Sequence, residues 1–147
     1  MDKKNSTDQL QSTMGEWFGK LPPLPASAIE AIFKIMPVLA LIFGILGVLL
    51  SVAGLGALSI LAPFAVVGGV APHYGLGIIA TFGWLVSSVM MLMAYSGLKS
   101  GKMGGWNLLF WSEVVNAVTA IIGISIGSVV GAAIAFYLLF QLKPKYK

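Results

Sequence analysis

The stretch WNLLFWSEVVNAVTAIIGISIGSVVGAAIAFYLLFQL, residues 106–142, decides the fold. Its apolar residues form two runs separated at residues 123–127, which predicts two helices folded back on each other as a hairpin. Glu113 is the one charged residue in the stretch. A bilayer penalises a polar group at depth by a few kcal/mol, so a carboxyl that is kept there usually has a structural or functional role.

The composition excludes an ordinary water-soluble domain. The chain has 147 residues, a mean hydropathy of +0.93 and 10% charged residues, whereas soluble domains average about 25% charged residues. This length suits one compact domain. The chain has no Cys, which removes disulfides, thiolate metal sites and thiol catalysis together.

The charges are distributed as in a membrane protein. The net charge of +4 comes from nine Lys and no Arg, and the Lys residues flank the apolar runs. Such flanking Lys residues follow the positive-inside pattern and do not indicate a nucleic-acid-binding surface. We therefore expect the lipid bilayer as a partner and no nucleic acid.

The N-terminal segment, residues 1–26, is polar with one amphipathic stretch. Ser6 and Gln9 have the spacing of a capping box. The apolar residues that follow recur at helical spacing: Leu10, Met14, Trp17, Phe18 and Leu21. We predict a short helix on the cytoplasmic membrane surface, with Trp17 and Phe18 in the headgroup region. A disordered tail is the alternative that the sequence leaves open.

Residues 27–147 form the predicted membrane domain. A crossing needs about 20 apolar residues, and four runs supply them, at about 35–55, 76–98, 106–122 and 124–142. The intervening segment 56–75 is interrupted by Gly and Pro, and a crossing there would put the Lys-bearing segments on opposite sides. We predict that it is an extracytoplasmic, non-spanning segment, and the sequence leaves open whether it is interfacial, re-entrant or an extension of the preceding helix. The predicted fold is all-α, with four transmembrane helices and an interfacial N-terminal helix.

Two patterns mark the predicted last hairpin. With 3.6 residues per turn, Ser112, Asn116 and Thr119 fall on one narrow stripe that continues to Gly123. In the final helix small residues repeat every four positions, at Gly123, Gly127, Gly131 and Ala135. Such a ridge lets another helix backbone approach closely. The ridge packs either on the polar stripe within the hairpin or on a second subunit, and the sequence leaves both arrangements open.

Glu113 lies about 10 Å below Trp106, inside the hydrocarbon zone. One interpretation is structural: the carboxyl is protonated or hydrogen-bonded to Asn116 or to a facing hydroxyl of Tyr137, Ser87 or Ser88. A second is a functional proton or cation site that Glu113 forms with Asn116, Ser112 and Thr119. A third is an ion pair with Lys34, the one Lys near a span end that is placed to reach inward.

Aromatic residues near the predicted span ends are expected to anchor the protein at the membrane interface: Trp17, Phe18, Tyr74, Tyr95, Trp106 and Tyr146. His73, the only histidine, is expected to be a polar loop residue, because a single His without Cys or clustered carboxylates builds no metal site. The acidic residues other than Glu113 lie near the N-terminus, opposite His73 in this topology, so no catalytic set forms. We expect no enzyme activity, no metal and no cofactor.

The segments GWNLLF at 105–110 and GAAIAFYLLFQLKPKY at 131–146 resemble small, uncharacterised four-helix membrane proteins of bacteria. The resemblance implies a multi-pass protein of the bacterial cytoplasmic membrane, here with both termini in the cytoplasm, and no known activity. We expect a non-enzymatic structural or interaction protein that forms a homo-oligomer through glycine-rich faces or belongs to a larger membrane complex. The alternative is a small ion- or proton-coupled channel or transporter that uses Glu113.

Overall fold

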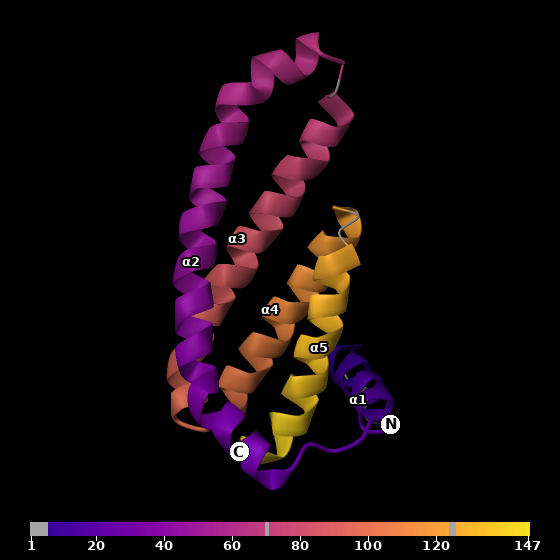
Figure 1. Cartoon of the computed structure of the whole chain (residues 1–147), viewed down its shortest axis with the longest axis vertical. Coiled ribbons are helices and arrows are strands. Elements are labelled where there is room, and N and C mark those ends of the chain that lie inside the picture. The colour runs from indigo at the N-terminus through magenta and orange to yellow at the C-terminus, as the bar shows by residue number, and fades with distance from the viewer. Residues whose placement is uncertain (1–5, 70, 124–125) are drawn as a thin grey trace.

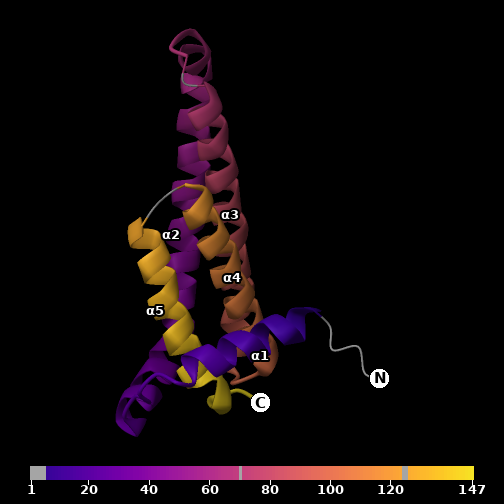
Figure 2. The ribbon, with the colours of Figure 1, turned by 90° about the vertical axis from the view of Figure 1, so that its right-hand side faces the viewer.

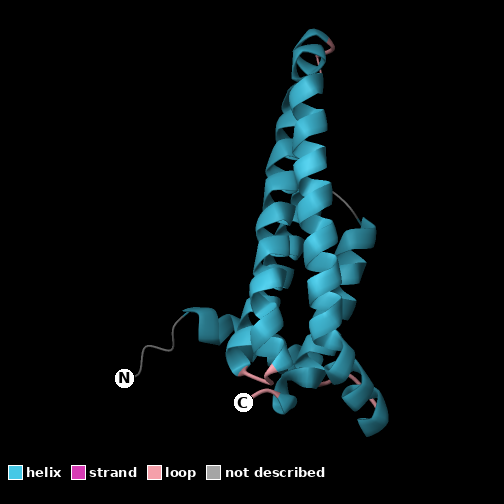
Figure 3. Ribbon diagram, turned by 90° about the vertical axis from the view of Figure 1, so that its left-hand side faces the viewer, coloured by secondary structure: helices cyan, strands magenta, loops and turns pink. Residues whose placement is uncertain are grey.

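The computed structural model describes residues 6–69, 71–123 and 126–147, and all regular structure within these ranges is helical. The elements are α1 (Ser6–Phe18), α2 (Ala26–Val67), α3 (Ala71–Lys99), α4 (Met103–Ile122), α5 (Ile126–Leu142) and the 3₁₀ turn η1 (Lys143–Lys145). Helices make up almost the whole ribbon (Figure 3). The all-α prediction is therefore confirmed for these residues. Residues 1–5 and 124–125, which belong to the predicted tail and to the start of the fourth span, lie outside them.

The helices form two hairpins of unequal length (Figure 1). The pair α2 and α3 makes the long hairpin, and α4 and α5 make a shorter one beside one half of it. The helix α1 lies across the base of α5, at the end of the molecule where the C-terminus also lies (Figure 2). The charged residues of the described ranges, apart from Glu113, lie on the elements or connections that meet there, and we call it the charged end.

The helix α2 is a single helix of 42 residues, about 63 Å long. The sequence placed the end of the first span near residue 55, and α2 continues from there for about three more turns, across Pro63. Of the three possibilities left open for residues 56–75, the structure shows a helix extension as far as Val67, where α3 packs along α2 and supports the backbone that proline weakens. The hydroxyl of Tyr74 on α3, for example, donates to the carbonyl of Leu58. The predicted irregular segment 56–75 is thus mostly helical.

Small residues line the seam between α2 and α3. The buried stripe of α2 includes Ala40, Gly44, Gly47 and Ser51, at spacings of three or four residues. A Cβ on Gly44 would lie 2.7 Å from Cδ2 of Leu92, so the two helices approach more closely than any larger residue would allow. The sequence patterns predicted such a ridge only in the last helix, although the same spacing rule would have found this one.

The connection between α3 and α4 brings two backbones together. Gly101 has a φ of +66°, which favours glycine. A Cβ on Gly97 would lie 2.7 Å from the Cα of Gly105. Ser87 continues the contact further along, because its hydroxyl donates to the carbonyl of Ser112 at 3.0 Å. The start of α4 is therefore pressed against the end of α3.

The largest buried side chains gather at the charged end. The rings of Trp106 and Phe110 stack with centroids 5.4 Å apart, and the indole Nε1 of Trp106 donates to the carbonyl of Leu139 at 2.8 Å. Phe136 and Phe140 of α5 pack against Phe110 at centroid distances of 5.7 and 5.8 Å. These aromatic contacts fix α5 on α4 in the half of the hairpin nearer the charged end.

Two of the predicted interface anchors are core residues instead, and a third is partly buried. Trp106 is fully buried and Tyr146 is 3% exposed. Phe18 packs against the core and stacks on Phe140 with ring centroids 5.6 Å apart. These predictions are wrong because α1 and the end of the chain fold over the base of α4 and α5, which buries aromatic rings near the helix ends. Trp17 is 72% exposed, as an interface residue requires.

Away from the charged end the long hairpin continues alone (Figure 1). We call residues 56–67 of α2 and 73–79 of α3 the distal hairpin. Its large apolar side chains are exposed, as these residues illustrate: Ile60, Leu61, Phe64, Val66, Val67, Leu76, Ile78 and Ile79. An exposed apolar surface of this kind is stable in an apolar solvent and not in water.

Three described segments are long and apolar enough to cross a membrane: Ala26–Val67, His73–Lys99 and Ile126–Lys145. The helix α4 is 20 residues long but carries Asn107, Glu113 and Asn116, and it is not among them. The helices therefore suit a membrane protein, as predicted. A fourth crossing and a membrane-surface position for α1 stay predictions.

Candidate functional site

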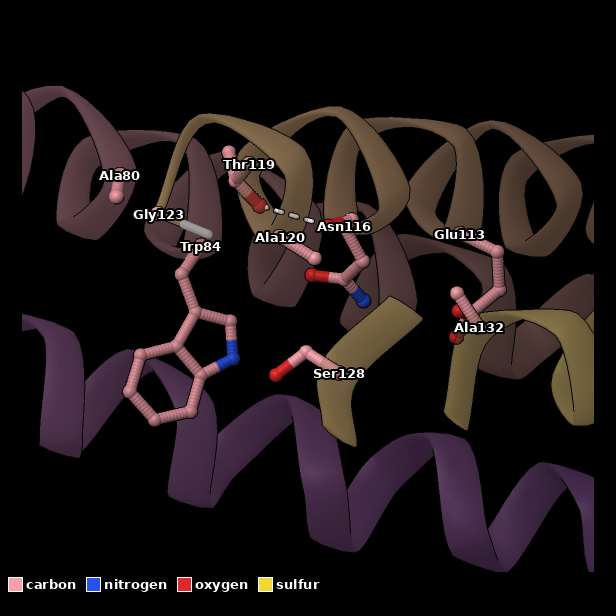
Figure 4. A pocket seen from close by; sticks show the side chains of 9 residues that line it. All are labelled: Ala80, Trp84, Glu113, Asn116, Thr119, Ala120, Gly123, Ser128 and Ala132. Atoms are coloured by element: carbon pink, nitrogen blue, oxygen red, sulfur yellow. Dashed lines mark hydrogen bonds between the residues drawn. The ribbon is translucent and has the colours of Figure 1, made fainter. Parts of the chain in front are cut away.

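A pocket of about 460 Å³ lies between α3, α4 and α5. Figure 4 shows how Glu113, Asn116 and Thr119 reach it from α4, Trp84 from α3 and Ser128 from α5. The remaining lining residues are small: Ala80, Ala120, Gly123 and Ala132. Because the pocket gathers a carboxyl, an amide and two hydroxyls within an apolar bundle, it is the candidate functional site.

The pocket exists because α5 loses contact with α4 away from the charged end. Near that end Phe136 and Leu139 are buried. In the next turns the inward positions of α5 hold only Ala132 and Ser128, and residues 126–131 are all exposed. The change from large to small side chains along one helix face leaves a wedge-shaped space between the two helices.

Glu113 is half-buried in this wedge, and Figure 4 places it beside Ala132 of α5. Its carboxyl interacts with the side chain of Asn116, one turn further along α4. This contact is one of the structural arrangements that the sequence predicted. The three predicted hydroxyl partners donate elsewhere, Tyr137 to the carbonyl of Pro22 at 2.6 Å, Ser87 to that of Ser112 at 3.0 Å and Ser88 to that of Trp84 at 2.8 Å.

The predicted ion pair between Glu113 and Lys34 is not formed. Lys34 is exposed near the start of α2, and the one ion pair within residues 6–69, 71–123 and 126–147 joins Lys145 to Glu30 at 3.9 Å. This interpretation is wrong because Glu113 lies too far from the charged end for a lysine there to reach it. Glu113 lies about 16 Å along α4 from Lys102, which marks the charged end, and a lysine side chain does not span that distance.

The predicted polar stripe divides between two surfaces. Ser112 is fully buried, its hydroxyl donates to the carbonyl of Leu109 at 2.7 Å, and it does not line the pocket. Thr119 lines the pocket, while its hydroxyl donates to the carbonyls of Val115 and Asn116 of its own helix. The structure therefore brings together Glu113, Asn116 and Thr119, and separates them from Ser112.

The glycine ridge of α5 does not pack on the polar stripe. A Cβ on Gly127 or on Gly131 would meet no atom of the described residues within 4 Å, so the predicted intramolecular contact is wrong at these two positions. The buried face of α5 is formed by Ala132 and the large residues after it, which lie about a quarter turn away from the ridge. The face of α5 that carries the larger apolar side chains, such as Phe136 and Leu139, packs against the bundle, and the glycine ridge therefore does not.

A second pocket, of about 300 Å³, lies between α2, α3 and α4, and Trp84 and Asn116 line both pockets. The indole of Trp84 is 42% exposed. It faces α2, since a Cβ on Gly47 would lie 3.8 Å from its Nε1. The sequence patterns did not point to Trp84. Its position in the middle of an apolar run, away from the span ends where Trp is enriched, is the signal that would have singled it out.

Comparisons with protein-family models, with curated proteins and with solved structures find no match to this chain. Within the described ranges no three His, Cys, Asp or Glu side chains are grouped so as to hold a metal ion. His73 is exposed in the first turn of α3 and not in a loop. Fold and site together define the class: a protein that is helical over the described residues, with three segments long and apolar enough to cross a membrane and a pocket that gathers polar side chains between its helices.

Proposed function

We propose that this protein is a non-enzymatic integral membrane protein of the bacterial cytoplasmic membrane that self-associates through the glycine ridge of α5. The supporting observation is that a methyl group on Gly127 or Gly131 would meet no atom of the described chain within 4 Å. A glycine inside a helix costs about 1 kcal/mol relative to alanine. Elsewhere in this chain, at Gly44 and Gly97, helical glycines permit close contact. A second copy supplies the corresponding contact for α5.

The surface around the ridge supports this role. Gly127 and Gly131 repeat at the small-xxx-small spacing and are exposed. Val130 and Ile134, which lie to one side of them, are 54% and 56% exposed. Because the glycines have no side chain, they leave a shallow depression beside these residues, which we call the groove. A helix of a second copy that lies in such a groove gains backbone-to-backbone packing that lipid chains do not provide.

The proposal includes four crossings with both termini in the cytosol. The 20 residues of α4 extend about 30 Å, which matches the hydrocarbon core. Its polar residues Glu113 and Asn116 line the pocket between α3, α4 and α5, where polar groups in membrane helices are usually found. Lys99 and Lys102 flank the α3–α4 turn and lie at the charged end with the C-terminal Lys residues, which accords with the positive-inside rule.

Fluorescence energy transfer between labelled copies in liposomes tests self-association. Gly131→Leu fills the groove and is expected to weaken association by about tenfold or more, which is about 1.4 kcal/mol. Gly77→Leu is the matched control, because Gly77 is also a helical glycine without a described neighbour within 4 Å but lies in the distal hairpin. A wild-type protein that stays monomeric at high protein-to-lipid ratio, or equal association of wild type and Gly131→Leu, contradicts the proposal.

A second candidate is a small proton- or cation-coupled channel or transporter. It is favoured by the pocket, which gathers Glu113, Asn116 and Thr119 around a space large enough to be wet. In liposomes, proton flux through the wild type and its loss in Glu113→Gln would support this function. Glu30→Gln, which removes an exposed carboxylate at the charged end, is the control. If none of the three proteins conducts protons, this second function is contradicted and self-association is left as the proposed function.

A further inference from the structure

Two adjacent pockets share Trp84 and Asn116 in their linings and differ in their other residues. We call the two pockets together the Trp84–Glu113 cleft. At one end the carboxyl of Glu113 lies near α5, and at the other the indole of Trp84 lies against α2. Gly83 contacts Thr119, so Trp84 and Glu113 are separated by about 8 Å along the bundle. A ligand of moderate size therefore reaches both.

The carboxyl end of the cleft has no cation of its own. In the described part of the chain no Lys lies within 4 Å of Glu113, and the side chain that interacts with it is the neutral amide of Asn116. A carboxylate inside an apolar bundle is stabilised by a positive partner, because water does not solvate it fully there. A cationic ligand supplies that partner.

The oxygen atoms in the cleft are too few for a hard inorganic cation. Calcium takes six to eight oxygen ligands and magnesium requires a nearly complete octahedron. Around Glu113 the cleft offers the two carboxyl oxygens, the amide oxygen of Asn116 and the hydroxyl oxygens of Thr119 and Ser128, which is fewer than six. An organic cation needs no such shell, since one carboxylate and an aromatic face satisfy its charge.

The remaining surface of the cleft suits an apolar body. The pocket on the α2 side is lined largely by apolar side chains: Phe43, Leu46, Leu50 and Met91. The two volumes, about 460 and 300 Å³, lie within the range of small-molecule sites. The half-exposed indole of Trp84 presents its ring to the occupant. Both pockets are partly open, which allows a ligand to enter from outside the bundle.

We propose that the Trp84–Glu113 cleft binds a lipophilic organic cation, with its charged centre beside Glu113 and its apolar groups against Trp84. The site does not depend on self-association through α5, because Gly127 and Gly131 do not line it. It requires neither transport nor an enzymatic step.

Binding of tetraphenylphosphonium to the protein in lipid nanodiscs tests the proposal, with equilibrium dialysis as the measurement and empty nanodiscs as the baseline. Glu113→Gln is expected to weaken binding by about 30-fold or more, as removal of one partner from a desolvated charge pair does. Trp84→Ala is expected to weaken it by about fivefold through loss of the aromatic contact between the indole and the phenyl groups. Glu30→Gln and Trp17→Ala, which change exposed residues at the charged end, are the matched controls and should bind like wild type.

Tetraphenylborate, an anion of nearly the same size and shape, separates specific binding from partition into apolar surface. Equal binding of the two ions, or unchanged tetraphenylphosphonium binding by Glu113→Gln, would overturn the proposal. A test on the wild type avoids any folding defect of a variant: an apolar carbodiimide labels Glu113, and mass spectrometry measures the yield. Tetraphenylphosphonium should protect Glu113 and tetraphenylborate should not, and absence of protection also overturns the proposal. Gly131→Leu should bind the cation normally, which separates this result from a failure of self-association.

Discussion

The charged end and the distal hairpin are built from similar apolar residues but are stabilised in different ways. At the charged end Trp106 and Phe110 are completely buried by other parts of the chain. In the distal hairpin Phe64 is 71% exposed and Val67 is 90% exposed. The charged end is thus held together by protein packing, whereas the distal hairpin depends on the contact between its two helices and on an apolar surrounding.

The length of α2 also distinguishes the distal hairpin from the charged end, because the helix is longer than a membrane is thick. From Ile35 to Val67 it carries no charge and extends about 50 Å, while a hydrocarbon core is about 30 Å thick. A tilt of 40° accommodates only about 39 Å of helix within that thickness. The tip of the distal hairpin, where His73 and Tyr74 lie, is therefore expected at or beyond the headgroup region farther from the charged end.

The largest expected effect concerns the aromatic core. Phe110→Ala removes a fully buried ring and should lower the free energy of unfolding by about 4 kcal/mol. The same truncation at Phe64 in the distal hairpin should change it by less than about 0.5 kcal/mol, because few protein contacts are lost there. Thermal unfolding in detergent, followed by circular dichroism, measures both. Equal losses would show that the two regions are packed alike.

The next largest effect is the change in stability when a glycine is replaced by alanine, and it depends on whether that glycine lies against another helix. A methyl group on Gly105 collides with the backbone of Gly97 and Leu98, so Gly105→Ala should cost about 2 kcal/mol or more. A methyl group on Gly77 in the distal hairpin would meet no described atom within 4 Å outside its own stretch of helix, and Gly77→Ala should stabilise the helix by up to about 1 kcal/mol. The same unfolding assay applies. Destabilisation by Gly77→Ala would reveal a contact in the distal hairpin.

The smallest effect depends on pH. Burial raises the pKa of Tyr146 to about 12, and its hydroxyl has no hydrogen-bond partner among the residues that the structure describes. Between pH 10 and pH 12 the unfolded chain loses this proton while the folded chain keeps it, so stability should fall by up to about 1.4 kcal/mol per pH unit.

Tyr146→Phe provides the control for this pH dependence. The variant should lose that part of the decline and be at least as stable as wild type at pH 7, since it removes a buried hydroxyl that no described residue pairs with. The unfolding temperature at pH 8 and pH 11 measures the difference between the two proteins. Parallel declines in wild type and variant would show that Tyr146 titrates as an exposed group.

Part of the candidate site was predictable from the sequence. Glu113 and Asn116 lie one turn apart on the same helix, so local geometry places them together wherever that helix packs. Ser112 lies on the same stripe, yet it is buried against α3 and does not line the pocket. How much of the stripe the neighbouring helix covers depends on the packing of α3, which the sequence of α4 does not contain. Trp84 is 29 residues away from Glu113 in the sequence, and nothing in its local pattern links the two.

The sequence by itself determined that the chain is helical and apolar, where its charges lie, and which polar groups are kept deep within it, because these properties follow from residue type and local periodicity. Only the tertiary structure decided that α2 continues across Pro63, that Trp106 is buried, and that the ridge at Gly131 faces outward. Each of these depends on which large side chains compete for the same buried space, and that competition involves residues far apart in the chain.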